Sequence, residues 1–120
     1  MKTIEHDSPA SLDFLLKIKA DFIGALAHPA RLRLIEALKR GPRTVGELAA
    51  EAQLAQPATS KHLGLLRQAG ILEARPEGKT VRYRITDPAL FRALGAVNAL
   101  LEARLRRSQQ ALKALGRHPA

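Results

Sequence analysis

One helical segment of the chain presents a face that is rich in hydrogen-bond donors. Leu63 and Leu66 mark the buried side of the segment that follows Ala55, so residues spaced away from them project outward. The outward set is polar, contains no acid, and consists of Gln56, Ser60, Lys61, Gly64 and Arg67. Such donors suit the acceptors on base edges and phosphates of nucleic acid. An ordinary solvated helix face would look the same, so the surrounding elements must decide.

A second donor group follows in a pair of basic strand patterns. Residues 80–85 alternate, with Val81, Tyr83 and Ile85 on one face and polar or basic side chains on the other. The candidate phosphate contacts of this pair are Arg75, Lys79, Arg82 and Arg84. Charged side chains also protect strand edges from aggregation, and the two roles are compatible.

The chain has four histidines and no cysteine, which excludes disulfides, thiolate metal sites and thiol redox chemistry. We expect His28 to cap or pack between two helices, and His62 to contact a phosphate or a base. A terminal site of His6, Asp7 and His118 would offer nitrogen and oxygen ligands that zinc accepts. Mobile ends make poor preformed sites, so the sequence predicts no metal site and no cofactor.

The elements before the donor-rich helix are also marked in the sequence. Apolar residues at helical spacing predict a first helix over about 10–27, which ends before Pro29. A second helix begins at Pro29 and is expected to bury Leu32, Ile35, Ala37 and Leu38. Gly41 and Pro42 end it.

A capping-box pattern, Thr44 with Glu47 three residues later, opens a third helix over 44–52. A turn at 53–55 leads to the donor-rich helix over 56–69, which Gly70 ends, and a strand pair follows with its turn at 76–79. This order predicts a mainly α fold with a small β-hairpin, a winged helix-turn-helix. The donor-rich helix would enter the major groove of double-stranded DNA and the hairpin would lie along the backbone. Thr44 joins the candidate DNA contacts.

A long last helix over about 88–115 carries an apolar stripe that no later segment could cover. The stripe favours a homodimer formed through the terminal helices, 10–27 and 88–115. The candidate interface residues are Leu12, Leu15, Leu16 and Phe22 from the first helix and Leu90, Leu94, Val97, Leu101 and Leu105 from the last.

Composition agrees with a nucleic-acid partner. Lys and Arg number 20 against 11 acids, a net charge of +9 that favours polyanions. The 120 residues fit a single winged helix-turn-helix domain, 1–120, with frayed ends at 1–10 and 116–120. No apolar run could span a membrane and no signal peptide is visible, so we expect a cytoplasmic protein. No nucleophile–base–acid set, phosphate loop or metal triad is visible, so we expect no enzyme.

Several of these segments resemble the ArsR/SmtB family of bacterial repressors. The run Phe22–Ile35, with its Leu-Ala-His-Pro-Ala-Arg-Leu core, is similar to the opening of that family, and residues 44–49, 56–63 and 66–72 are similar to its third helix, recognition helix and exit. Gly78, Lys79 and Tyr83 match its wing. The resemblance covers about residues 12–105. It implies a dimeric winged helix-turn-helix repressor that leaves its promoter when a signal arrives.

The chain also departs from that family's pattern. Ala55 stands where Ser is frequent, so the recognition helix lacks its usual N-cap hydroxyl, and Gln53 stands where Gly is common. The cysteines of arsenic, cadmium and persulfide sensors are absent, as are the last-helix histidines of zinc and nickel sensors. A small organic effector, a terminal metal site and no effector at all remain open. A protein-interaction module and a general architectural DNA coat are the alternatives to an operator-specific repressor.

Overall fold

The computed structural model describes residues 9–116. Its contacts form two compact units, one ending at Thr86 and the other beginning at Asp87. The first unit holds four α-helices and a small sheet, and the second holds one long helix. The prediction of a single domain over residues 1–120 is not tested by this division and stays a prediction.

Helix α1 spans Pro9–Leu26 and α2 spans Pro29–Ala37, followed by a short 3-10 turn, η1, at Leu38–Arg40. His28 is extended between the helices (φ −154°, ψ 125°), as the residue before a proline prefers. The expected stripe of α2 was partly wrong. Leu32 is 41% exposed, whereas Leu34, which the stripe left out, is fully buried.

Helices α3 (Val45–Ala52) and α4 (Gln56–Gln68) form the predicted helix-turn-helix. The turn depends on Gln53, whose left-handed backbone (φ 58°, ψ 48°) is uncommon for a residue with a side chain. Glycine adopts that region at no steric cost, whereas Gln53 adopts it with a side chain.

The sheet has one strand more than the sequence predicted. Strands β2 (Leu72–Glu77) and β3 (Thr80–Ile85) form the hairpin, and β1 (Arg43–Thr44) pairs antiparallel with the other edge of β3, in the order β1-β3-β2. Two residues are too few to show an alternating pattern, so β1 was not predicted. The hairpin turn is also shorter than the predicted 76–79, because Glu77 and Thr80 still pair.

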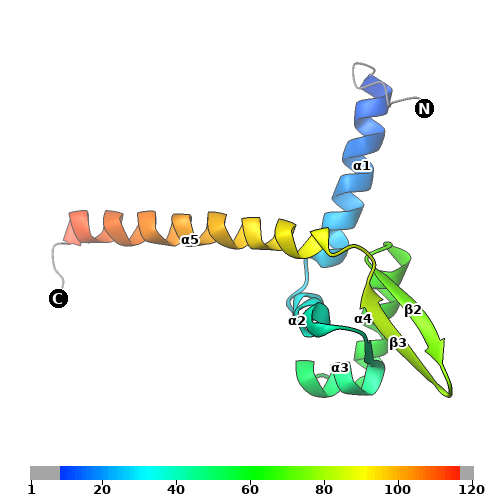
Figure 1. Cartoon of the computed structure of the whole chain (residues 1–120). Coiled ribbons are helices and arrows are strands. Elements are labelled where there is room, and N and C mark those ends of the chain that lie inside the picture. Colours follow the sequence, from blue (N-terminus) through cyan, green and yellow to red (C-terminus); the bar gives the residue numbers. More distant parts are fainter. Residues whose placement is uncertain (1–8, 117–120) are drawn as a thin grey trace. The chain divides into compact units, whose positions relative to one another are not determined.

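Helices α2, α3 and α4 group beside the hairpin (Figure 1) and bury a small aliphatic core. Its side chains come from every element of the group, and the largest that are fully buried are Leu34, Ile35, Leu48, Leu63 and Leu66. The core therefore holds α4 by one face and leaves the opposite face to solvent.

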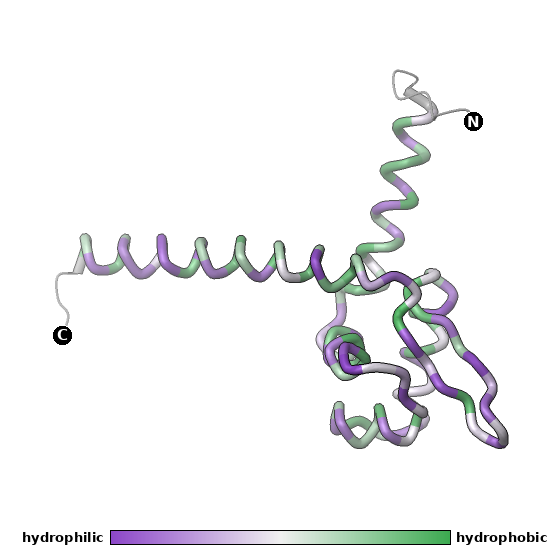
Figure 2. Tube along the Cα trace, viewed as in Figure 1, coloured by the Kyte–Doolittle hydropathy of each residue, from purple (hydrophilic) through white to green (hydrophobic). Residues whose placement is uncertain are grey.

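Helix α5 spans Ala89–Gly116. The Asp87 carboxylate accepts a hydrogen bond from the Ala89 amide at 2.9 Å, as a residue that caps the start of a helix does. Hydrophobic residues recur along α5 and along α1 (Figure 2). Many of them are exposed in the single chain, including Leu12, Leu16, Leu101 and Leu105.

Candidate nucleic-acid interface

The start of α3 is held by the predicted capping box. Thr44 Oγ1 accepts from the Glu47 amide at 3.2 Å, and Glu47 Oε1 accepts from the Thr44 amide at 2.9 Å. These bonds satisfy two of the amides that a helix start leaves unpaired. The hydrogen bond that the Thr44 amide donates to Glu47 holds the pKa of the Glu47 carboxyl below its usual 4.5, and the charges of Arg82 and Arg43 lower that pKa further. At the other end of α3, Arg40 and Arg43 clamp the Glu51 carboxylate.

The recognition helix α4 is fixed by its inner face. Thr59 is fully buried with Leu63 and Leu66, and its hydroxyl donates to the Ala55 carbonyl at 2.9 Å. This bond satisfies a polar group that would otherwise be costly to bury. Ala55 stands at the N-cap with extended backbone and supplies no side-chain hydrogen bond, which confirms that α4 lacks this cap.

The outer face of α4 agrees with the prediction from spacing. Gln56, Ser60, Lys61, Gly64 and Arg67 are all exposed. None of the four with polar side chains makes a side-chain hydrogen bond or ion pair within residues 9–116. Their donors are therefore available to an external acceptor, and no carboxylate lies among them.

His62 behaves differently from the other polar residues of α4. It is only partly exposed, and its Nδ1 accepts a hydrogen bond from Arg31 Nε at 3.2 Å. His28 caps α2 by accepting from the Ala30 amide, and its ring lies 4.7 Å from that of His62, as expected for a residue that packs between helices. The Nδ1 atom of His62 thus has an intramolecular partner in Arg31, of which sequence spacing gave no sign. The contact of His62 with a phosphate or a base stays a prediction.

The hairpin separates its side chains onto two faces. Residues paired across it place Glu73, Arg75 and Glu77 opposite Arg84, Arg82 and Thr80, and place Leu72, Ala74 and Pro76 opposite Ile85, Tyr83 and Val81. Directly opposite residues of an antiparallel pair share a face, so one face is charged and the other apolar. This confirms the predicted alternation of β3.

The arginines of the charged face are not equivalent. Arg82 Nε lies 2.6 Å from Glu77 Oε1, and Arg82 Nη1 lies 3.6 Å from Glu47 Oε1. Arg84 Nε lies 3.1 Å from Glu73 Oε1. Arg75 and Lys79, in contrast, are exposed and make no ion pair or side-chain hydrogen bond in the described chain. The sequence showed the arginines but not their carboxylate partners.

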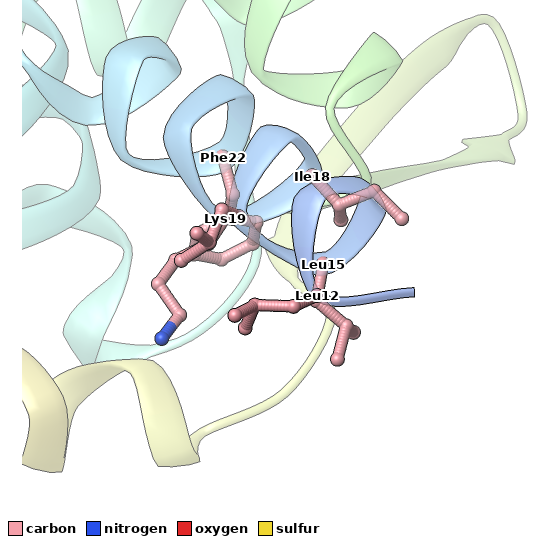
Figure 3. A pocket seen from close by; sticks show the side chains of 6 residues that line it. Leu12, Leu15, Ile18, Lys19 and Phe22 are labelled. Carbon is pink, nitrogen blue, oxygen red and sulfur yellow. The ribbon is translucent and has the colours of Figure 1, made fainter. Parts of the chain in front are cut away.

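The residues predicted for dimerisation differ in how much surface they offer. Leu12, Leu15, Leu16 and Phe22 line an open groove of about 570 Å³ on α1, together with Ile18 and Lys19 (Figure 3). On α5, Val97, Leu101 and Leu105 are exposed and Leu94 is half-buried. Leu90 is only 9% exposed in the single chain, so it offers a partner little area, and its place in the interface stays a prediction.

No group of three or more His, Asp or Glu side chains within residues 9–116 could hold a metal ion. His6, Asp7 and His118, the terminal alternative, lie outside the described residues. None of the described helices combines the length and hydropathy needed to span a bilayer.

Comparison with known proteins decides the family. Residues 28–74, which run from the α2 cap through the helix-turn-helix into β2, match the model described as "Bacterial regulatory protein, arsR family". An uncharacterised HTH-type transcriptional regulator of Mycobacterium tuberculosis, Rv0081, is 40% identical over 88 residues, which cover 72% of this chain and 77% of the relative. The chain belongs to the ArsR family.

Relatives and solved structures extend the likeness of this ArsR-family protein. The biofilm growth-associated repressor of Agrobacterium fabrum is 42% identical over 81 residues, covering 68% of this chain and 69% of the repressor. The crystal structure of Rv0081 superposes with a TM-score of 0.72, at 38% identity, over 78% of this chain and 95% of that one. A solution structure from Mycobacterium bovis, Mb0332, described as a homodimeric winged helix-turn-helix DNA-binding domain, has a TM-score of 0.71 at 29% identity and covers 79% of this chain and 88% of that one. The fold is therefore a winged helix-turn-helix.

Proposed function

We propose that the protein is a homodimeric transcriptional repressor that binds a specific DNA operator through α4. The observation that carries this proposal is the outer face of α4, which is exposed, acid-free and without hydrogen-bond or ion-pair partners among residues 9–116. A helix of this kind, placed second in a helix-turn-helix, presents its side chains to base edges in the major groove.

We assign the DNA contacts according to which side chains have hydrogen-bond donors without a partner in the described chain. The contacts with base edges or phosphates in the major groove are assigned to the side chains whose donors are unpaired in the described chain: Gln56, Ser60, Lys61 and Arg67. Phosphates are held first by Arg75 and Lys79, since neither must leave a carboxylate.

Three further residues have weaker claims to a direct contact. The Arg82 and Arg84 guanidinium groups already face glutamates, whose negative charge reduces the net gain from a phosphate contact. The Thr44 hydroxyl is engaged in the cap of α3, so we propose that Thr44 orients α3 beneath the recognition helix.

A second copy of the chain is the proposed cover for the apolar residues of α1 and α5. Single soluble chains rarely leave large contiguous apolar patches exposed. A two-fold dimer would present two α4 helices to half-sites about one helical turn apart, so the operator would be palindromic. Support comes from the homodimeric description of the similar Mycobacterium bovis domain.

The proposed repressor works without the cysteine metal sites found in part of its family. The chain has no cysteine, and the sequence from 89 to 116 has no histidine. A small organic effector and a protein partner are therefore the first candidates for the signal.

The test is fluorescence anisotropy with the DNA just upstream of the protein's own gene and a shuffled duplex of the same composition. The expected result is tight binding to the upstream DNA that chelator and divalent metals leave unchanged. Ser60→Ala with Gln56→Ala should weaken specific binding more than binding to shuffled DNA, since each good base contact contributes about 1–3 kcal/mol of discrimination.

Lys79→Ala should weaken binding to both duplexes and reduce the slope of log affinity against log salt by about 1. Lys17→Ala is the matched control, because it removes the same charge from an exposed site on α1. Equal affinity of the wild-type protein for both duplexes would favour an architectural DNA coat, and binding to neither would favour a protein-interaction module. Either outcome would contradict the proposal.

A further inference from the structure

One guanidinium joins three helices of the first unit. Arg31 of α2 donates from Nη1 to the Ala25 carbonyl in the last turn of α1, at 3.1 Å, and from Nε to His62 Nδ1 on α4, at 3.2 Å. The side chain is half-buried, so these bonds are shielded from water more than surface pairs are. Arg31 therefore connects the helix proposed for dimerisation with the helix proposed for DNA recognition.

Hydrogen bonding fixes the protonation state of the two histidines beside Arg31. His62 Nδ1 accepts from Arg31, and His28 Nδ1 accepts from the Ala30 amide at 3.2 Å. Arginine and the backbone amide are always donors here, so neither Nδ1 carries a proton and each neutral ring keeps its proton on Nε2. The rings lie 4.7 Å apart, so a charge on one acts directly on the other.

We propose that Arg31 is a positioning residue that holds α4 through His62, and that protonation of His62 releases this hold and lowers operator specificity. The proposal rests on the proposed function as far as DNA is concerned. His62 directly follows Ser60 and Lys61, whose side chains lie on the outer face of α4. A shift of the helix at His62 therefore displaces the groove-reading side chains.

Protonation must break the bond because of where the proton goes. Nε2 is already protonated, so the added proton goes to Nδ1 and turns the acceptor into a donor that faces Arg31 Nε. Two donors cannot bond, and an imidazolium then lies beside a guanidinium and a second histidine.

The surroundings favour the neutral ring. Burial lowers the pKa of His62 below its ordinary value of 6.5, and His28, Arg31 and Lys61 lower it further. These are the groups that act on its charge: His28 and Arg31 face it from the start of α2, and Lys61 lies on its own helix. No carboxylate among the described residues offsets them. The His62 ring is therefore the neutral acceptor at pH 7.5, because its pKa lies below 6.5.

The same geometry opposes a metal ion on this pair. A metal bound at either Nε2 would move the proton to Nδ1, where the Arg31 and Ala30 donors already point. The hydrogen bonds of His28 and His62 therefore disfavour zinc at this pair of rings.

The first test needs no DNA. Proton NMR of the full chain would follow the His62 imidazole from pH 8 to 5, in the wild type, Arg31→Lys and His28→Asn. Asparagine keeps an acceptor for the Ala30 amide but does not titrate, so His28→Asn removes the neighbouring charge while preserving the cap. The pKa of His62 should lie below 6.5 in the wild type and rise in His28→Asn. A wild-type value at or above 6.5 would overturn the proposal.

The second test measures specificity as a ratio, which cancels the general effect of added positive charge. Anisotropy with the upstream DNA and the shuffled duplex at pH 7.5 and 5.5 should show the wild-type ratio falling several-fold. The fall stays below about tenfold, or about 1.4 kcal/mol, because protonation of a group whose pKa lies below 6.5 can contribute no more than this at pH 5.5. His62→Asn keeps an acceptor near Nδ1 and cannot charge, so its ratio should change less than about twofold, about 0.4 kcal/mol. Arg31→Lys should show a reduced ratio already at pH 7.5.

The outcomes separate the two proposals. An equal pH dependence of the ratio in wild type and His62→Asn, or an Arg31→Lys ratio equal to wild type, overturns the positioning role while leaving the repressor intact. A wild-type ratio of one at pH 7.5 instead overturns the repressor and the specificity part of this proposal together. The His62 titration, which needs no DNA, still tests the Arg31–His62 contact.

Discussion

Replacing Ala55 with serine should stabilise the protein. Ala55 occupies the N-cap of α4 with φ −65° and ψ 143°, the extended backbone that a capping serine adopts, but it has no side-chain acceptor. Ala55 is exposed, so an added hydroxyl meets no packed neighbour. The missing cap is therefore a local deficit that a single oxygen atom should correct.

The size of the gain follows from which amides of the first turn need a partner. The Thr59 amide already bonds the Ala55 carbonyl at 3.0 Å, and Pro57 has no N–H. The Ala58 amide, at the third helical position, is the one that a serine hydroxyl would reach. A cap of this kind contributes about 1 kcal/mol, within a range of about 0.5–2 kcal/mol. With an unfolding entropy of about 2.1 cal/mol/K per residue, a chain of this length should gain roughly 4 °C in Tm.

The assay is thermal and urea unfolding followed by circular dichroism, at one fixed protein concentration because dimerisation makes Tm concentration-dependent. Ala55→Thr and Ala55→Val form a matched pair, since they have nearly the same shape and differ in one hydroxyl. Threonine should be the more stable of the two, with an unchanged urea m value. Equal stability of the pair, or no gain in Ala55→Ser, would refute the assignment of a free Ala58 amide.

Substitutions at Leu101, Thr44 and Glu47 test the dimer and the cap of α3. Leu101 is 49% exposed on α5, and Leu101→Lys should shift the protein from dimer to monomer in light scattering. Gln110→Lys, on the opposite side of the helix, is the control and should leave the dimer intact. A dimer that survives both substitutions would contradict the proposed interface. Thr44→Ala should lower the free energy of unfolding by about 0.5–2 kcal/mol. Because the folded pKa of Glu47 is lowered, its contribution is present above pH 4.5 and is lost as pH falls through the folded value, and urea unfolding of Glu47→Gln should lack this loss.

Local signals in the sequence predicted most of the first unit. The Thr44–Glu47 capping box, the proline at the start of α2 and the glycine after α4 each act through bonds to residues only a few positions away. Periodicity also placed Leu63 inside and Ser60 outside correctly, because the core fixes one face of α4 and the helix repeat then determines the other.

Local sequence signals could not predict the contacts between segments that lie far apart in the chain. The strand β1 exists only because Arg43 and Thr44 meet Tyr83 and Arg82, some 40 positions later. In α2, periodicity chose Leu32 for the core, but the packing of α3 and α4 against that helix buried Leu34 instead.

The charged residues show most clearly which features the sequence determines and which depend on the tertiary structure. By itself, the sequence determined that the chain is a basic winged helix-turn-helix whose recognition helix has a donor-rich outer face, since spacing along one helix settles which side chains share a side. Only the tertiary structure decided which charges are free. It paired Arg84 with Glu73 and Arg31 with His62, and left Lys79 without a partner in the described chain. Hydrogen bonds and ion pairs depend on distances of about 3 Å between atoms, and such distances are set only when separate elements pack together.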